Sequence, residues 1–140
     1  MSDDRASHLA MIQGVITRMG TNSFVLKGWN VTMVSALFAL AVKDSNSRFI
    51  MIAFLPALAF WILDAYYLRQ ERLFRKLFDD VRRSTEEKKN SCESYSMATG
   101  KYTNDVESPF STMFASSVFV LHGTVIVTII LVMTILFFAR

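Results

Sequence analysis

The chain is poor in the residues that build disulfides, metal sites and catalytic centres. Among its 140 residues it has one cysteine, two histidines and two prolines. A single thiol, Cys92, can form neither an intramolecular disulfide nor a cysteine-rich metal site. Walker loops, zinc-ligand spacings and glycine-rich dinucleotide loops are also missing. We therefore expect no enzyme, no cofactor and no metal, and a net charge of only +3 gives no reason to expect nucleic-acid binding.

Long apolar runs are what the chain does have. They cover residues 24–42, 49–68 and 110–138. A bilayer core about 30 Å thick is crossed by about 20 apolar residues in a helix. The segments between the runs are too short to bury a core of ordinary size. We therefore predict an all-α integral membrane protein with three transmembrane helices, and the lipid bilayer as its first partner.

The predicted architecture is a single membrane domain over residues 1–140. Its parts, in order, are an amphipathic helix at 6–20, a first span at 23–42, a second span at 49–68, a cytoplasmic helical extension of that span at 69–88, a polar loop at 89–108 and a third span at 109–139. Ser108 is the predicted cap of the third helix, with Pro109 in its first turn.

The predicted N-terminal helix rests on a spacing of three and four residues. Leu9, Ile12, Ile16 and Met19 recur at that spacing, and Gly20 is a suitable stop. Such a helix could lie on the inner leaflet or pack on a neighbouring subunit.

The second span is predicted to continue beyond the membrane. Neither glycine nor proline follows Tyr67 until well past residue 88, so one helix is expected from about Phe49 to about Lys88, with a kink at Pro56. The extension could be a surface helix on the leaflet or a stalk that contacts copies of itself. In the second case the oligomer contact is an apolar stripe: Leu73, Phe74, Leu77, Phe78 and Val81.

The distribution of lysine and arginine predicts the orientation. Basic residues concentrate in 69–108 and are nearly missing after the third run. Under the positive-inside rule the N-terminus should be cytoplasmic and the C-terminus periplasmic or extracellular.

Two charged residues in the apolar runs should neutralise each other. Asp64 lies one turn inside the cytoplasmic end of the second span, and Lys27 lies at a similar depth in the first. Charges in the hydrocarbon are costly and usually paired. The predicted Lys27–Asp64 pair could pin two helices together, or it could act in gating or sensing.

His122 is the third ionisable residue in an apolar run. Counted from Ser108 it lies about 14 residues into its helix, near the middle of the membrane. His122 and Asp64 could in principle pair, but their predicted depths differ, which argues against a contact. Because Val118, Val125 and Ile129 share its face, His122 is either a hydrogen-bonded packing residue or part of a wet path.

Hydroxyl side chains mark another face of the third span. Ser117, Thr124 and Thr128 could line a water-filled path, although such hydroxyls often bond only to their own helix. Small residues also recur at a spacing of four, in Ser35-xxx-Ala39 and Ala53-xxx-Ala57, where helices can approach closely.

Three stretches carry a resemblance to a known group of proteins. They read IQ-x-V-I-x-R-M at 12–19, NSF-x-LKGW at 22–29 and W-x-LDAY-x-L-x-QERLFR at 61–75. In these stretches the chain resembles a family of small, uncharacterised bacterial inner-membrane proteins. The resemblance implies a location in the bacterial inner membrane and an association with anti-phage defence.

These observations lead to a functional expectation with alternatives. The first is an oligomeric membrane effector or channel-like module that alters membrane permeability when a trigger reaches its cytoplasmic extension. The second is a non-conducting anchor or adaptor that holds a soluble cytoplasmic partner through 69–108. The third is a small transporter subunit.

Overall fold

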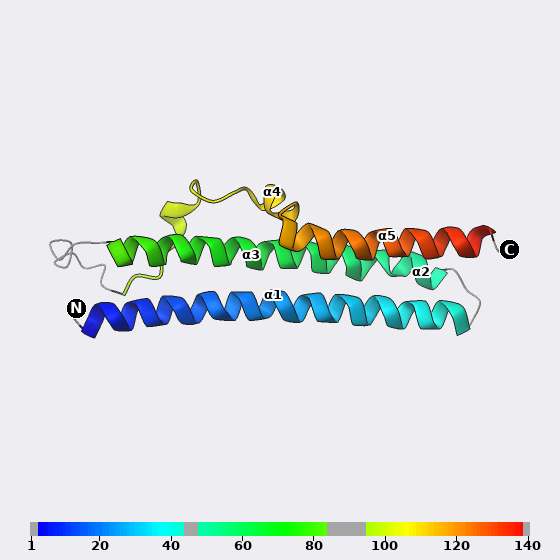
Figure 1. Ribbon diagram of the computed structural model, residues 1–140, viewed down its shortest axis with the longest axis horizontal. Coiled ribbons are helices and arrows are strands. Elements are labelled where there is room, and N and C mark those ends of the chain that lie inside the picture. Colours follow the sequence, from blue (N-terminus) through cyan, green and yellow to red (C-terminus); the bar gives the residue numbers. More distant parts are fainter. Residues whose placement is uncertain (1–2, 44–47, 84–94, 139–140) are drawn as a thin grey trace.

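The computed structural model describes residues 3–43, 48–83 and 95–138, and every regular element in these ranges is helical. The elements, labelled in Figure 1, are α1 (Asp3–Lys43), α2 (Arg48–Ile52), α3 (Phe54–Arg83), the 3-10 helix η2 (Gly100–Tyr102), α4 (Pro109–Met113) and α5 (Ser116–Phe138).

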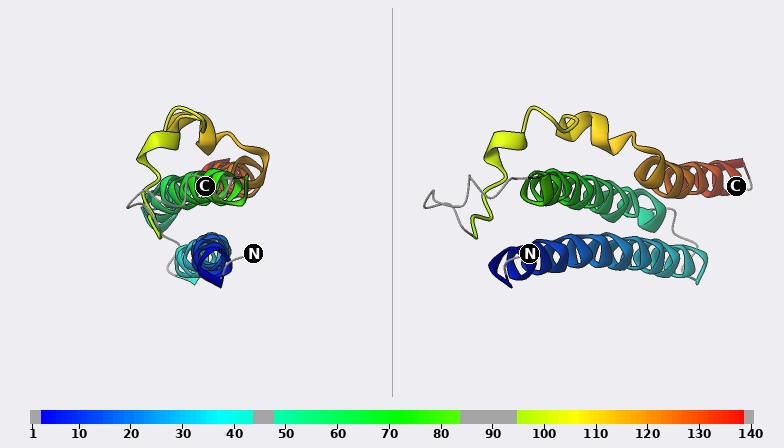
Figure 2. Two further views of the ribbon diagram at one scale, coloured as in Figure 1. Left: turned by 90° about the vertical axis from the view of Figure 1, so that its left-hand side faces the viewer. Right: turned by 60° about the vertical axis from the view of Figure 1, so that its left-hand side comes forward.

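The helices form an elongated bundle in which α1 and α3 run antiparallel side by side (Figure 1). At one end α5 lies beside α2 and the start of α3. At the other end lie residues 95–108, which we call the strap. The strap begins beside the start of α1, where Tyr95 and Ser96 contact Asp4 and His8, and then crosses to the side of α3 opposite to α1 (Figure 2). The two ends therefore have different third layers: a helix at one and the strap at the other.

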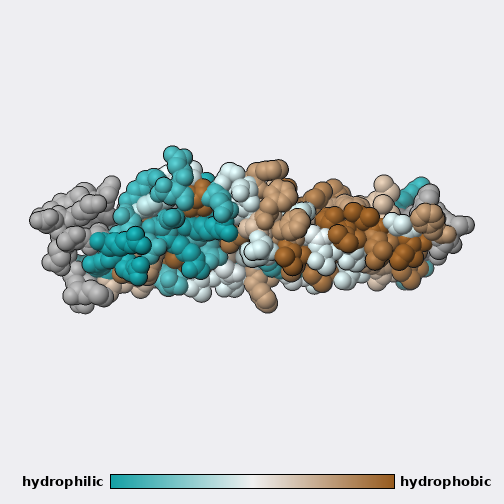
Figure 3. Space-filling view, turned by 45° about the horizontal axis from the view of Figure 1, so that its top comes forward, coloured by the Kyte–Doolittle hydropathy of each residue, from teal (hydrophilic) through white to brown (hydrophobic). Residues whose placement is uncertain are grey.

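Hydropathy changes along the length of the bundle, so that one end is hydrophilic and the other is hydrophobic (Figure 3). We call residues 24–43, 48–68 and 116–138 the apolar half, and residues 3–23, 69–83 and the strap the polar half. Three helical stretches, Asp4–Lys43, Arg48–Arg83 and Ser116–Leu136, are long and apolar enough to cross a membrane. The prediction of an all-helical chain with three such helices is confirmed at this level.

The first helix does not break where the sequence suggested. α1 is one helix of 41 residues that passes through Gly20, so the predicted division into 6–20 and 23–42 is wrong. Ile12 and Ile16 are buried against Leu73 and Leu77 of α3. A glycine inside a helix costs only about 1 kcal/mol. The burial of Ile12 and Ile16 before Gly20, and of Asn30 and Val34 after it, outweighs that cost.

The second span is interrupted beside Pro56. Its regular helix stops at Ile52 and resumes at Phe54. Pro56 has no amide hydrogen for the carbonyl of Ile52, and its ring crowds that carbonyl. The amide of Ala53 still donates to the Phe49 and Ile50 carbonyls, at 3.2 and 3.1 Å, so the chain direction is kept. Helix α3 then runs unbroken to Arg83, and the predicted end near residue 88 lies outside the described residues.

The third span begins as predicted but is divided. The hydroxyl of Ser108 accepts a bond from the Ser111 amide at 3.1 Å, and Pro109 opens α4. However, α4 ends at Met113 and α5 starts at Ser116, so the predicted continuous helix over 109–139 is wrong. The indole of Trp61 donates to the Met113 carbonyl at 3.0 Å. In a continuous helix that carbonyl would instead accept from the backbone amide of residue 117.

The apolar stripe of the extension is covered by the chain itself. Leu73 and Leu77 are 4% and 3% exposed and pack with Ile12, Ile16 and the strap residue Tyr102. The rest of the stripe (Phe74, Phe78 and Val81) is partly buried against the same cluster. Leu73 and Leu77 therefore do not offer an exposed surface to other copies, and an oligomer contact through the rest of the stripe stays a prediction.

The strap is docked along α3, whereas a polar loop was predicted at 89–108. The Tyr102 hydroxyl and the Lys101 ammonium both reach Asp80, at 2.6 and 2.8 Å. Arg72 pairs with Glu107 at 2.7 Å. The bond to Asp80 raises the pKa of Lys101 above its ordinary value, and burial together with that carboxylate raises the pKa of Tyr102. The first part of the predicted loop, 89–94, lies outside the described residues.

Candidate functional site

A buried cluster of polar side chains is centred on Asp64, which has no exposed surface. The Lys27 ammonium lies 2.6 Å from Oδ2 of Asp64 and 2.8 Å from its Oδ1. The Ser23 hydroxyl donates to Oδ1, and Lys27 also donates to that hydroxyl at 2.7 Å. The structure thus contains the predicted Lys27–Asp64 pair and adds Ser23 to it.

His122 joins the same cluster, against the sequence-based expectation. Its Nε2 lies 3.1 Å from Oδ2 of Asp64, and both side chains are fully buried. The expectation was wrong because depth was counted from Ser108. Helix α5 starts at Ser116, so His122 follows that start by six positions, about 9 Å along the axis, and reaches the level of Asp64.

The other nitrogen of His122 defines its protonation in this arrangement. The amide nitrogen Nδ2 of Asn30 lies 2.9 Å from His122 Nδ1. An NH2 group can only donate, so Nδ1 must accept and carries no proton. The ring proton is then on Nε2 and is donated to Asp64. His122 is therefore held at both ring nitrogens.

Local sequence spacing explains how α1 and α3 supply these groups. Ser23, Lys27, Asn30 and Val34 recur at intervals of four, three and four, which places them on one face of α1. Asp64 and Trp61 are likewise three apart on α3. The sequence reasoning missed Asn30 as a site residue, although its position three residues after Lys27 was a usable signal.

An aromatic group closes one side of the cluster. The indole of Trp61 stacks on the His122 ring, with centroids 6.1 Å apart and planes within 8°. Phe114 and Phe119 contact the same indole, at centroid distances of 6.4 and 6.1 Å. Because Trp61 also holds the Met113 carbonyl, the turn between α4 and α5 is tied to the cluster.

The hydrogen-bonding capacity of the cluster is almost completely used. Both oxygens of Asp64 have partners, and the charges of Lys27 and Asp64 sum to zero. The exception is Asn30: it is fully buried, and its Oδ1 has no hydrogen-bond partner among the described residues. Lys27 and Ser23 are partly exposed, and the Lys27 side chain is 19% exposed. The arrangement can therefore hold three helices in register.

The hydroxyl face of α5 lies elsewhere. Ser117, Thr124 and Thr128 are exposed on the outside of the chain. The hydroxyls of Thr124 and Thr128 donate to the carbonyls four residues earlier, at 2.6 and 2.9 Å. Within a single chain these residues therefore line no interior path.

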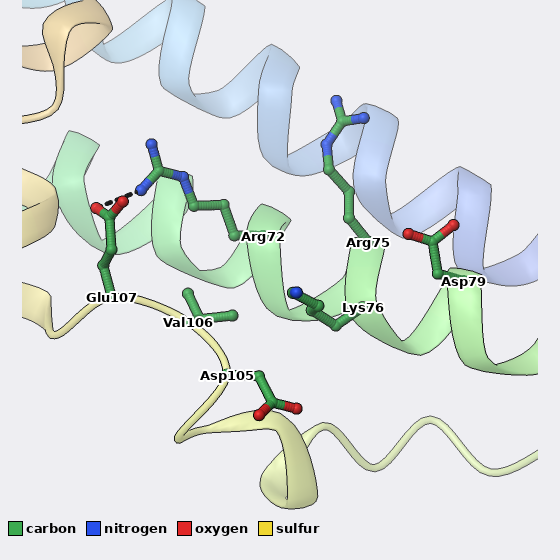
Figure 4. A pocket seen from close by; sticks show the side chains of 7 residues that line it. All are labelled: Arg72, Arg75, Lys76, Asp79, Asp105, Val106 and Glu107. Atoms are coloured by element: carbon green, nitrogen blue, oxygen red, sulfur yellow. Dashed lines mark hydrogen bonds and ion pairs between the residues drawn. The ribbon is translucent and has the colours of Figure 1, made fainter.

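A second polar feature is a groove of about 250 Å³ between α3 and the strap (Figure 4). Its charged lining is mixed, with three basic and three acidic side chains: Arg72, Arg75, Lys76, Asp79, Asp105 and Glu107. Within the described ranges, no group of three or more His, Cys, Asp or Glu side chains could hold a metal ion. The charges of the groove sum to zero, and Arg72 and Glu107 are already paired with each other.

No protein family, curated protein or solved structure that was compared with this chain matches it.

Proposed function

We propose that the chain is one subunit of an oligomeric membrane module that changes the permeability of the bilayer. The observation that carries the proposal is the buried Lys27–Asp64–His122 cluster, which joins the three helices that could cross a membrane. Ionisable residues inside a bilayer are costly, and by default they mark functional positions. We infer that this cluster sets the relative position of the helices in the resting state.

The distribution of charge supports an orientation for this module. The basic residues of α3 and the strap lie in the polar half, which would stand in the cytoplasm, and α5 would end on the periplasmic side of a bacterial inner membrane. Continuous helices α1 and α3 connect the two halves. A trigger that binds the polar half could therefore act on the buried cluster without an intervening hinge in either helix.

Several copies are needed because the described residues of one chain enclose no path. The interior of the apolar half is filled by packed side chains, among them Val34, Ala41, Ile50 and Ile129. α1 leaves another surface open for contact between copies: Gly28, Thr32, Ser35 and Ala39 are all exposed and recur at intervals of four, three and four. Small residues at this spacing let membrane helices approach closely. We propose this face as an oligomer contact.

Gly28→Leu tests that contact. A Cβ added at Gly28 meets nothing within 4 Å, so a single chain has room for it, whereas a closely packed second helix does not. Light scattering after size exclusion in detergent should show a smaller species for Gly28→Leu than for the unmodified chain. The matched control is Gly14→Leu, because Gly14 is equally open but lies in the polar half. A monomeric unmodified protein, or an unchanged size for Gly28→Leu, would contradict the proposal.

The permeability change itself is tested in vesicles. Purified oligomer, reconstituted into vesicles with a potassium gradient and a potential-sensitive dye, should dissipate the gradient faster than empty vesicles. Gly28→Leu should remove the effect and Gly14→Leu should keep it. Intact oligomers that leave the gradient unchanged would exclude a conducting role.

A non-conducting adaptor is the second candidate, and the mixed-charge groove favours it. In that case a soluble cytoplasmic partner would bind between α3 and the strap. Lys76→Glu would weaken that binding, while the vesicles would show no leak.

A role in anti-phage defence is proposed on the resemblance in 12–19, 22–29 and 61–75. Phage should then form fewer plaques on bacteria that express the unmodified chain than on bacteria that express Asp64→Asn at the same level. Equal plating for both would count against this role.

A further inference from the structure

The position of His122 between a carboxylate and an amide points to a ligand. We propose that the cluster is a proton-binding site: His122 takes up a second proton on Nδ1, and the Asn30 amide turns over so that its oxygen accepts that proton. In the present arrangement Asn30 Nδ2 donates to Nδ1 over 2.9 Å, and Asn30 Oδ1 is buried without a partner.

Both protonation states fit the same space. Turning the amide exchanges an oxygen and an NH2 group of nearly equal size, so no side chain has to move aside. In the neutral state Oδ1 is the unpaired atom, and in the protonated state the NH2 group takes that place. Each state leaves one amide atom of Asn30 unpaired, so the hydrogen-bond cost, typically about 1–3 kcal/mol, is similar in both. Charge then decides between them.

The charges around His122 come from two helices. From α3, Asp64 lies 3.1 Å from Nε2 and favours a positive ring. The face of Trp61 stacks on the ring and also favours a cation. From α1, Lys27 disfavours a second positive charge. The sequences of α4 and of the rest of α5 contain no ionisable residue. One proton takes the cluster from zero to +1.

Protonation redistributes the bonds of Asp64. A positive His122 competes with Lys27 for the same carboxylate oxygen, Oδ2. Lys27 is the partner that can leave, because its side chain already reaches the surface. Proton uptake should therefore strengthen the contact between α3 and α5 and weaken the contact between α1 and α3. That this shift changes permeability rests on the proposed function, whereas proton binding itself does not.

Nuclear magnetic resonance of the ring nitrogens tests the site directly. His8→Gln leaves His122 as the sole histidine of the full chain, and the glutamine can still donate to the Ser96 carbonyl that His8 contacts at 3.1 Å. The protein, labelled with 15N-histidine, is titrated in nanodiscs between about pH 4.5 and 9, around the ordinary histidine range. At high pH Nδ1 should give the signal of an unprotonated nitrogen, and at low pH both nitrogens should give protonated signals.

Two variants of Asn30 separate this site from a merely buried histidine. Asn30→Asp supplies a negative acceptor to Nδ1 and should move the titration midpoint up by about one to three pH units. Asn30→Leu removes the acceptor and should move the midpoint down. If His8→Gln fails to fold, the unmodified chain is measured and the two histidines are assigned with His122→Gln.

Two results would overturn the proposal: an unprotonated Nδ1 throughout the range in folded protein, or a midpoint that neither Asn30 variant moves. The vesicle assay at matching pH keeps this result apart from the proposed function. A titrating His122 in vesicles that never leak retains the proton site and removes the permeability role. Leaking vesicles with a His122 that does not titrate give the opposite result.

Discussion

Ion pairs occur in both halves of the molecule, but their surroundings differ. In the polar half, Arg82–Asp79 and Lys101–Asp80 join side chains that are roughly half exposed. In the apolar half, Lys27–Asp64 joins a carboxylate with no exposed surface to a mostly buried ammonium. Water already solvates the exposed pairs, so each of them contributes at most about 1 kcal/mol to stability. Breaking the buried pair leaves one partner with an uncompensated charge in an apolar environment. Burial, more than distance, therefore decides how much each ion pair matters for the stability of this protein.

The largest expected effect comes from breaking the buried pair. Lys27→Met should destabilise the folded protein by about 3–5 kcal/mol, because Asp64, which has no exposed surface, then keeps an uncompensated charge. Asp64→Asn should also destabilise it, and the double change should recover part of the loss. Unfolding in detergent measures all three. Asp79→Asn is the matched control at an exposed pair and should change little. Additive losses in the cycle, or an equal loss for Asp79→Asn, would contradict the comparison.

The next effect concerns the core of the polar half. Leu77 is 3% exposed between α1 and the strap, so Leu77→Ala should cost about 2–5 kcal/mol through lost packing. Because the residue is covered by its own chain, the oligomer should keep its size while its unfolding temperature falls. Light scattering and thermal unfolding together check this. If the oligomer of Leu77→Ala dissociates without any loss of stability, Leu77 contacts another copy and this prediction is wrong.

A smaller effect is expected at His122. Replacing it by leucine removes the donor to Asp64 and the acceptor for Asn30, at a typical cost of about 1 kcal/mol for membrane hydrogen bonds. His122→Cys, in a chain that also carries Cys92→Ser, should react slowly with a water-soluble maleimide because position 122 is fully buried. Fast labelling in intact membranes would indicate a wet path instead.

The smallest effect is the response of the strap to alkaline pH. The pKa values of Tyr102 and Lys101 are raised from 10.0 and 10.5 in the folded protein. Above about pH 10 the docked strap therefore holds more protons than the released strap, so its docking weakens as pH rises. A spin label at the exposed position 104, attached after Asn104→Cys and Cys92→Ser, should become more mobile above that pH. Tyr102→Phe should reduce this pH response and Tyr66→Phe should keep it; an identical response in all three proteins would refute the assignment.

Local features of the sequence determined part of this structure. The apolar runs predicted three helices able to cross a membrane, because helix formation and hydropathy depend on composition over about 20 residues. Ser108 and Pro109 predicted the start of α4, because capping involves only neighbours in the chain. The matched depth of Lys27 and Asp64 predicted their pairing, since unpaired charges are costly in an apolar environment.

Only the tertiary structure decided the rest, because the deciding partners are far apart in the sequence. Helix α1 passes through Gly20 because Ile12 and Ile16 meet Leu73 and Leu77 on α3. The apolar stripe is covered because Tyr102 closes over it from the strap. His122 reaches Asp64 because the Trp61 indole takes the Met113 carbonyl and α5 begins again at Ser116. In each case a contact between distant residues outweighed a local preference of about 1 kcal/mol or less, and no local pattern encodes that contact.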